Sequence, residues 1–165
     1  MPAYRKKGGT MPIRKLKAYL DENEVKYTVI QHSRAFTAQE IAEQANIPGK
    51  ELAKTVMVMI AGEVGMAVVP ASHLVDFKPL SEVAGTSVEL AEEGDFIELF
   101  PNCDVGAMPP FGNLYGMSVY VSEALAEDEF IAFSAGYHAE VIRLRYADFE
   151  RLVNPIVARF SYRFP

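Results

Sequence analysis

The chain has 165 residues, half of them hydrophobic, and carries a formal net charge of −6. Its length suits a single domain, and its composition supports a buried core and excludes global disorder. The longest apolar stretches, such as residues 56–61, are far shorter than the roughly 20 residues that a membrane-spanning helix needs. The sequence shows no secretion signal, and its single cysteine, Cys103, can form neither an internal disulfide nor a cysteine zinc cluster. We therefore expect a cytoplasmic protein.

Basic residues are concentrated towards the two ends of the chain. Residues 1–20 contain lysines and arginines but no acid, whereas no lysine or arginine occurs between Pro79 and Ile142. An acidic chain of this kind is not a general nucleic-acid coat, so a polyanion would bind a local patch, with an affinity that falls as salt rises. A solvated basic surface explains the same pattern, and both interpretations stay open.

The predicted helices are short. Residues 1–10 have the composition of a flexible leader, and a single domain is expected over residues 11–165. Pro12 suits a first helical turn, and Thr37 with Glu40 forms a capping-box pattern. Helices are expected at residues 12–20, from Thr37 to the Pro48–Gly49 pair, and at 79–84, 92–99 and 146–153.

Strands are predicted where β-branched and aromatic residues cluster between turn residues. They are expected at residues 27–31, 52–60, 64–69, 87–90, 117–121, 130–133, 140–145 and 156–160. Residues 101–116 contain three prolines and three glycines, which predicts an ordered loop. Because strands outnumber helices and often follow one another directly, we predict a mixed α/β (α+β) fold with a central mixed or antiparallel sheet flanked by helices.

Lys54 is the only charged residue between Leu52 and Ala61, a run that is otherwise suited to burial. Strand alternation places its side chain on one face with Val56 and Val58. The lysine is then either a gatekeeper that protects an edge strand from aggregation or a cation directed into a cleft. The residues alone favour neither interpretation.

A second candidate for chemistry is the glycine- and proline-containing segment 104–112. Gly106 permits backbone angles that would let N–H groups face outward, and Pro109 and Pro110 stiffen the chain after it. Such N–H groups could bind a carbonyl oxygen or a phosphate. A purely structural turn explains the same residues.

The sequence favours neither a metal site nor a nucleophile. Its histidines, His32, His73 and His138, are too widely spaced for a local zinc pattern. The GxSxG motif of many hydrolases, the P-loop of NTPases and the GxGxxG motif of dinucleotide-binding proteins are absent. Cys103 stands beside the acidic Asp104, which disfavours a reactive thiolate. We predict no metal and no other cofactor.

Taken together, these features resemble the YbaK/prolyl-tRNA synthetase editing-domain superfamily of aminoacyl-tRNA deacylases. The resemblance extends from about Ile13 to Val153. The matching positions are His32 with Thr37 and Glu40, Ala53-Lys54-Thr55, Val68–Pro70, Val75–Lys78, the Gly106-x-x-x-Pro110 motif with Phe111-Gly112, and Gly136 followed by Ile142–Leu144. The order and combination of the lysine and the GxxxP motif make the resemblance specific.

The resemblance implies a site without a protein nucleophile or metal. Lys54 would hold the terminal adenosine phosphate or the aminoacyl end, and Gly106 would offer backbone N–H groups to the ester carbonyl. The substrate-binding residues it implies are His32, Ala107, Met108, Pro110, Ser134 and His138. Contacts with tRNA are expected from Arg14, Lys15 and Lys17.

The function implied is a free-standing, trans-editing deacylase that hydrolyses the ester of misacylated tRNA. His138 resembles the branch that handles small residues such as alanine, whereas Val141 stands where the cysteinyl-tRNA branch tends to have an aspartate. The edited residue is therefore expected to be small, such as alanine or cysteine, with tRNA-Pro as a candidate carrier. The alternative is a non-catalytic module of the same fold that binds tRNA or an aminoacyl-tRNA synthetase. A thiol-based redox protein built around Cys103 is a third and weaker alternative.

Overall fold

The computed structural model describes residues 12–35 and 37–163, so the expected leader at residues 1–10 lies outside the described residues. In chain order the elements are α1 (Pro12–Glu22), β1 (Tyr27–Gln31), α2 (Ala38–Ala45), β2 (Leu52–Ile60), β3 (Glu63–Pro70), β4 (His73–Val75), α3 (Phe77–Ala84), β5 (Val88–Leu90), α4 (Glu93–Phe96), the 3-10 helices η2 (Ile97–Leu99) and η3 (Gly112–Tyr115), β6 (Val119–Ser122), α5 (Glu123–Ala126), β7 (Phe130–Ser134), β8 (Glu140–Arg145), α6 (Tyr146–Val153), β9 (Ile156–Ala158) and β10 (Ser161–Arg163).

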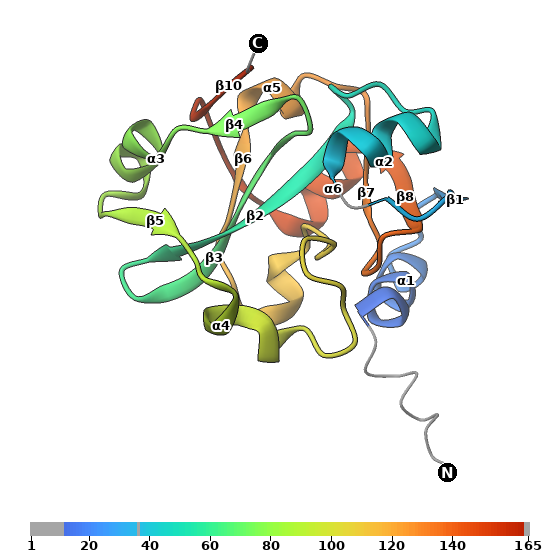
Figure 1. Ribbon diagram of the computed structural model, residues 1–165, viewed down its shortest axis with the longest axis horizontal. Helices are drawn as coiled ribbons and strands as arrows, with labels where there is room; N and C mark the ends of the chain where they lie inside the picture. Colours follow the sequence, from blue (N-terminus) through green and yellow to red (C-terminus); the bar gives the residue numbers. More distant parts are fainter. Residues whose placement is uncertain (1–11, 36, 164–165) are drawn as a thin grey trace.

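The main sheet has eight strands, seven of them in the order β1-β8-β7-β2-β3-β6-β9, with β5 pairing against β2 off this path. It is mixed, because β2 runs parallel to β7 and β6 runs parallel to both β3 and β9, whereas the other pairs are antiparallel. Figure 1 shows the long β2–β3 hairpin crossing the middle of the molecule, with α3 and β5 towards one end and α2, β7 and β8 towards the other. A separate two-stranded sheet joins β4 to β10.

Strand alternation divides the core between the two faces of the sheet. On one face, Met57 and Met66 pack in a cluster that includes α1, α6 and Phe111. On the other face, α2 covers Leu52, while Val58 packs in a cluster with α3. The central sheet thus presents apolar side chains on both faces, as the two helical layers require.

Most predicted elements are present with small shifts in their ends. α2 begins with the expected capping box, in which Thr37 Oγ1 accepts from the Glu40 N–H and Glu40 Oε1 accepts from the Thr37 N–H, each at 3.1 Å. It ends before the predicted Pro48–Gly49 pair, because Asn46 adopts a left-handed conformation with φ of 58°. Such a residue closes a helix, and asparagine tolerates it better than most side chains.

Four short elements were not predicted: β4, η3, α5 and β10. β4 and β10 have three residues each, too few for periodicity to identify, and they form only because they pair with each other. Across the part of the chain that the structure describes, none of the helices combines the length and the apolar composition needed to cross a bilayer.

Candidate active site

A cavity of about 410 Å³ opens where β2 and β7 separate. The two strands pair only at Leu52 and Ala53, so their ladder stops one residue before Lys54. Four segments that are distant in sequence line the cavity: the start of α2, residues 52–56 of β2, the loop that contains Gly106 and Met108, and Ser134 at the end of β7. This volume lies within the range of small-molecule sites.

Lys54 lines this cavity from β2. Its side chain is on the expected face, shared with Val58, and β2 is an interior strand with partners on both sides. At Lys54 one of these sides is open, because the pairing with β7 ends at Ala53 and the pairing with β5 begins at Val58. The position of Lys54 in the cavity lining favours a cation directed into a cleft over an edge-strand gatekeeper. The ammonium donates to the His73 carbonyl at 2.8 Å, and we find no second partner for it in the described chain. Two of its three N–H donors remain available to a ligand.

Partial burial lowers the pKa of Lys54. Desolvation disfavours the charged form, and the described structure shows no carboxylate paired with the ammonium to offset this effect. An anionic or strongly polar ligand would supply the missing partner, so the environment of Lys54 favours binding such a group over leaving the cavity to water.

The carbonyl that holds Lys54 belongs to β4 and is supported from the C-terminal strand. β10 pairs with β4, and the His73 imidazole Nδ1 lies 2.8 Å from Ser161 Oγ. Ser161 Oγ is in turn 2.6 Å from Ser122 Oγ. Burial lowers the pKa of His73, and the nearby Arg163 and Lys54 lower it further. Neutral His73 can therefore sit beside the Lys54 ammonium without adding a second positive charge.

The loop opposite Lys54, residues 103–110 and hereafter the Gly106 loop, has the backbone shape that the sequence predicts. Gly106 has a φ of 88°, in the region that side chains rarely adopt. The Ala107 N–H closes a turn by donating to the Asp104 carbonyl at 3.0 Å. The Gly106 and Met108 N–H groups make no hydrogen bond with any described residue. Because both residues line the cavity, their unpaired N–H groups are candidate donors to a ligand oxygen.

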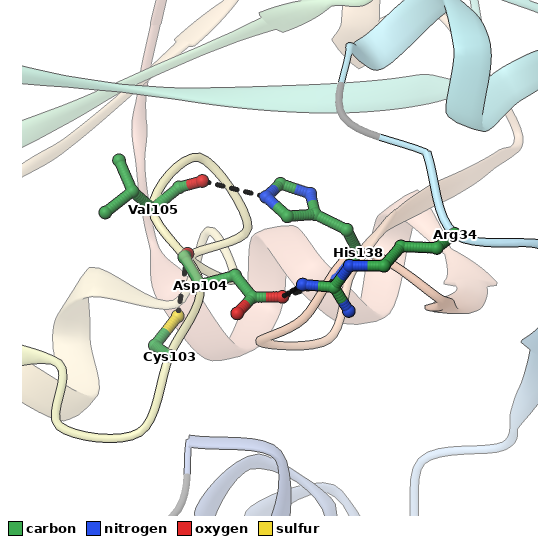
Figure 2. Close-up of polar contacts among 5 residues, drawn as sticks. All are labelled: Arg34, Cys103, Asp104, Val105 and His138. Atoms are coloured by element: carbon green, nitrogen blue, oxygen red, sulfur yellow. Dashed lines mark hydrogen bonds and ion pairs between the residues drawn. The ribbon is translucent and has the colours of Figure 1, made fainter.

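A network of side chains supports the Gly106 loop (Figure 2). The Arg34 guanidinium pairs with Asp104 Oδ2 at 3.0 Å, and the same oxygen accepts from the His138 N–H at 3.0 Å. The His138 imidazole Nε2 lies 2.9 Å from the Val105 carbonyl oxygen. His138 is buried and is not among the residues that line the cavity. The structure therefore places His138 beneath the loop, where it contacts the backbone next to Gly106.

The other predicted substrate-binding residues divide into two groups. Met108 and Ser134 line the cavity together with Lys54 and Gly106. Ala107 and Pro110 are buried in the loop and do not line the cavity. His32 is also outside the lining: its N–H donates to the Ala139 carbonyl, and its Nδ1 lies 2.7 Å from the Ser33 carbonyl oxygen.

Two of the three residues predicted to bind tRNA have partners within the chain. The Lys15 ammonium donates to the Leu114 carbonyl at 3.0 Å and lies 4.4 Å from the centre of the Tyr115 ring. The Lys17 ammonium is 3.3 Å from a carboxylate oxygen of Glu140, a side chain that is only 5% exposed. Arg14 is exposed on α1.

Neither a metal centre nor a reactive thiol emerges from the described residues. They contain no cluster of three or more histidine, cysteine, aspartate or glutamate side chains that could hold a metal ion. Cys103 does not line the cavity, and burial, reinforced by Asp104, raises its pKa to about 12. A thiol with so high a pKa is almost entirely protonated at neutral pH and is a poor nucleophile.

Sequence reasoning missed the residues that support the site, which are Arg34, Asp104, His73 and Ser161. Each acts through a contact with a segment distant in the chain, as in the Arg34–Asp104 ion pair and the His73–Ser161 hydrogen bond. No local motif could have identified them. From the sequence alone, Asp104 stands out only as the first residue of segment 104–112 and for its effect on the Cys103 thiol.

The fold and the cavity define a small mixed α/β domain whose ligand site joins a half-buried lysine to a glycine loop with N–H groups that have no partner among the described residues. A sequence model of the aminoacyl-tRNA editing domain matches residues 32–152. The chain belongs to this family. A search of curated proteins finds no match. β9 and β10 lie beyond the matched region, so the strand that supports the Lys54 partner is outside it.

Solved structures share this fold at low sequence identity. A protein described as hypothetical protein APE2540 has a TM-score of 0.80 at 21% identity, covering 90% of this chain and 99% of its own. A candidate trans-editing enzyme for prolyl-tRNA synthetase has a TM-score of 0.78 at 18% identity, covering 92% of this chain and 97% of its own. The predicted editing-domain fold is confirmed.

Proposed function

We propose that the protein is a trans-editing deacylase that hydrolyses the ester bond of tRNA carrying a small amino acid, such as alanine or cysteine. The observation that carries the proposal is the convergence of the Lys54 ammonium and the free Gly106 N–H on one cavity of about 410 Å³. Membership of the aminoacyl-tRNA editing-domain family supports it. A structural neighbour described in relation to prolyl-tRNA synthetase makes tRNA-Pro the first carrier to test.

The reaction needs a water molecule to attack the ester carbonyl carbon. The bond between that carbon and the ribose oxygen breaks, the amino acid leaves as a carboxylic acid that ionises, and the ribose oxygen takes up a proton. Negative charge develops on the carbonyl oxygen in the transition state, and backbone N–H donors such as those of Gly106 and Met108 stabilise it.

Among the residues that the structure describes, those lining the cavity include no histidine, carboxylate or thiol. An activated ester requires less assistance than an amide, and positioning with electrostatic stabilisation accounts for the rate. In this proposal Lys54 binds the phosphate or the aminoacyl end, and the 2′-hydroxyl of the terminal ribose assists the water. The hydroxyl groups of Thr55 and Ser134 add hydrogen-bonding partners in the same cavity.

The lining of the cavity suits an aminoacyl group with an apolar side chain. Ile41, Leu52 and Met108 contribute apolar walls, and the start of α2 lines one side. The choice of a small amino acid rests on the resemblance of His138 to the branch of the family that handles alanine, and not on the volume of the cavity.

The experiment is a deacylation assay against a panel of misacylated tRNAs, including alanyl- and cysteinyl-tRNA-Pro, with correctly charged prolyl-tRNA-Pro as the comparison. We expect faster hydrolysis of the small residues than of proline. Binding of tRNA without hydrolysis of any panel member would contradict the proposal and favour the alternative of a non-catalytic tRNA- or synthetase-binding module.

A further inference from the structure

We propose that His138 is a positioning residue, which orients the Gly106 N–H towards the cavity by holding the Val105 carbonyl from behind. The inference deepens the proposed function and rests on it for its catalytic meaning. It differs from the role implied by family resemblance, in which His138 contacts substrate, because the imidazole is buried beneath the loop and does not line the cavity.

The first step of the argument is the geometry of one peptide unit. The Val105 carbonyl and the Gly106 N–H belong to the same planar trans peptide, in which the two groups point in opposite directions. His138 Nε2 lies 2.9 Å from the Val105 oxygen, so the carbonyl faces the imidazole (Figure 2). The Gly106 N–H, on the other side of the same peptide, therefore faces away from the imidazole. A single hydrogen bond therefore sets the direction of the candidate oxyanion donor.

The second step is the protonation state that this contact requires. A carbonyl oxygen only accepts hydrogen bonds, so His138 Nε2 must carry the hydrogen. A side chain with a donor at the same reach can replace it, and one with a shorter reach cannot.

The third step is the position of the imidazole itself. The His138 N–H donates to Asp104 Oδ2, the oxygen that also pairs with Arg34. The Asp104 N–H donates to the Gly136 carbonyl, and the Gly136 N–H donates to the Ala107 carbonyl. The hairpin between β7 and β8 is thus joined to the Gly106 loop on both sides of the Val105–Gly106 peptide, through Asp104 and Ala107, which holds the His138 ring next to Gly106. A Cβ atom built on Gly106 would lie 3.7 Å from the His138 ring.

Two amide substitutions separate the reach of the donor from its polarity. The side-chain nitrogen of glutamine reaches about as far as Nε2, whereas that of asparagine reaches only about as far as Nδ1. We expect His138→Gln to keep kcat within about threefold of the wild type, and His138→Asn to lower kcat by about 30-fold or more, approaching the roughly 100- to 1,000-fold loss seen when an oxyanion donor is removed. KM should change by less than about threefold in both variants, because the donor acts in the transition state. Equal kcat values for the two variants would overturn the proposal.

A second measurement does not depend on deacylation. The amide resonance of Gly106 can be assigned by its disappearance in Gly106→Ala, and we expect it to be unchanged in His138→Gln and displaced in His138→Asn. Imidazole nitrogen spectra of the wild type should show hydrogen on Nε2 of His138, which requires no variant to fold. A proton on Nδ1 alone, or an unmoved Gly106 resonance in folded His138→Asn, would overturn the inference. A wild type that hydrolyses no tRNA but passes both spectroscopic tests would instead contradict the proposed function.

Discussion

The two sides of the cavity are held in different ways. On the β2 side, the Lys54 ammonium has one hydrogen bond, to the His73 carbonyl, and a flexible four-carbon stem. On the opposite side, the Gly106 backbone is joined to the β7–β8 hairpin through His138, Asp104 and several main-chain hydrogen bonds. One side can exchange its partner for a ligand, and the other can present N–H groups only in the orientation that the loop dictates.

This difference matches what each side would do in catalysis. A cation that recognises a phosphate or an aminoacyl end must release its internal partner when the ligand arrives. Donors that stabilise a developing oxyanion are most effective when they are already oriented, because no reorganisation is then needed during the reaction. Loss of Lys54 should therefore abolish its contact with the substrate. A change in the Gly106 loop should instead turn the N–H donors away from the developing oxyanion.

The largest expected effect tests Lys54, on the β2 side of the cavity. Lys54→Ala should reduce deacylation by about 100-fold or more, because the other described residues of the cavity lining provide no cation to position the substrate. Lys54→Arg should recover little of this loss, since a planar guanidinium cannot replace a compact ammonium at a shaped site. Single-turnover rates on alanyl-tRNA-Pro measure the effect.

Thermal unfolding supplies the control for Lys54. The midpoint should change little in Lys54→Ala, because a partly buried ammonium with a lowered pKa contributes little to stability. Lys50→Ala, which removes an exposed lysine four residues earlier, should leave activity unchanged and alter stability only slightly, through its interaction with Asp128. Full activity in Lys54→Ala would contradict the proposed site.

The next effect tests the Gly106 loop, on the opposite side of the cavity. Gly106→Ala places a side chain at a φ of 88°, which costs about 1–2 kcal/mol in a left-handed conformation. Space is not the obstacle, since the nearest atom is 3.7 Å from the added Cβ. We expect the loop to relax, the N–H to turn, and kcat to fall by about tenfold or more.

Gly85→Ala is the matched control for the Gly106 loop. Gly85 has a φ of 75° and no neighbouring atom within 4 Å of an added Cβ, so its substitution has a similar backbone cost away from the cavity. The two variants should lose similar stability, and only Gly106→Ala should lose activity. Equal activities would show that the loop conformation is not required.

The sequence predicted the Lys54 side of the cavity better than the Gly106 side. Lys54 was conspicuous because a single charge interrupts an apolar strand, and the bounds of β2 were predicted correctly. Gly106 was recognisable from its neighbours, Pro109 and Pro110. What the sequence could not predict was the support behind each group, because the Arg34–Asp104 pair and the β4–β10 pairing join segments that are about 70 or more residues apart.

The third prediction concerns the ion pair that anchors the hairpin beneath the loop. Glu140 begins β8, its carboxylate is almost fully buried, and it pairs with Lys17 at 3.3 Å. Lys17→Ala leaves that charge unpaired and should lower the free energy of unfolding by about 1–3 kcal/mol, less than for a fully buried pair because Lys17 is one-third exposed. Urea unfolding measures the loss.

A double variant distinguishes the ion pair from other roles of Lys17. Adding Glu140→Gln to Lys17→Ala should restore part of the stability, because the uncompensated charge is then removed. Arg14→Ala, on the exposed part of α1, should leave stability unchanged and raise only the KM for tRNA at low salt. Additive losses in the double variant would contradict a coupling between Lys17 and Glu140.

The smallest effect comes from a carboxyl that lies apart from both sides of the cavity. Burial is the main cause that raises the pKa of Asp128 to about 6; Lys50 opposes this shift, and Glu51 and Glu127 reinforce it. The folded protein therefore takes up a proton at Asp128 at a higher pH than the unfolded chain, so this residue makes stability rise as pH falls from about 6 to about 4.

Asp128→Asn removes the ionisation and should stabilise the protein at about pH 7.5 by less than about 1 kcal/mol, because the group is largely screened by solvent. The advantage should shrink by most of its value at about pH 4, where the wild-type carboxyl is protonated in the folded protein and about half protonated in the unfolded chain. Urea unfolding of both proteins at the two pH values measures it, and a difference that does not change with pH would exclude this ionisation as the cause. Because Asp128 does not line the cavity, the substitution should leave the deacylation rate unchanged throughout, which separates the pH dependence of the fold from that of Lys54.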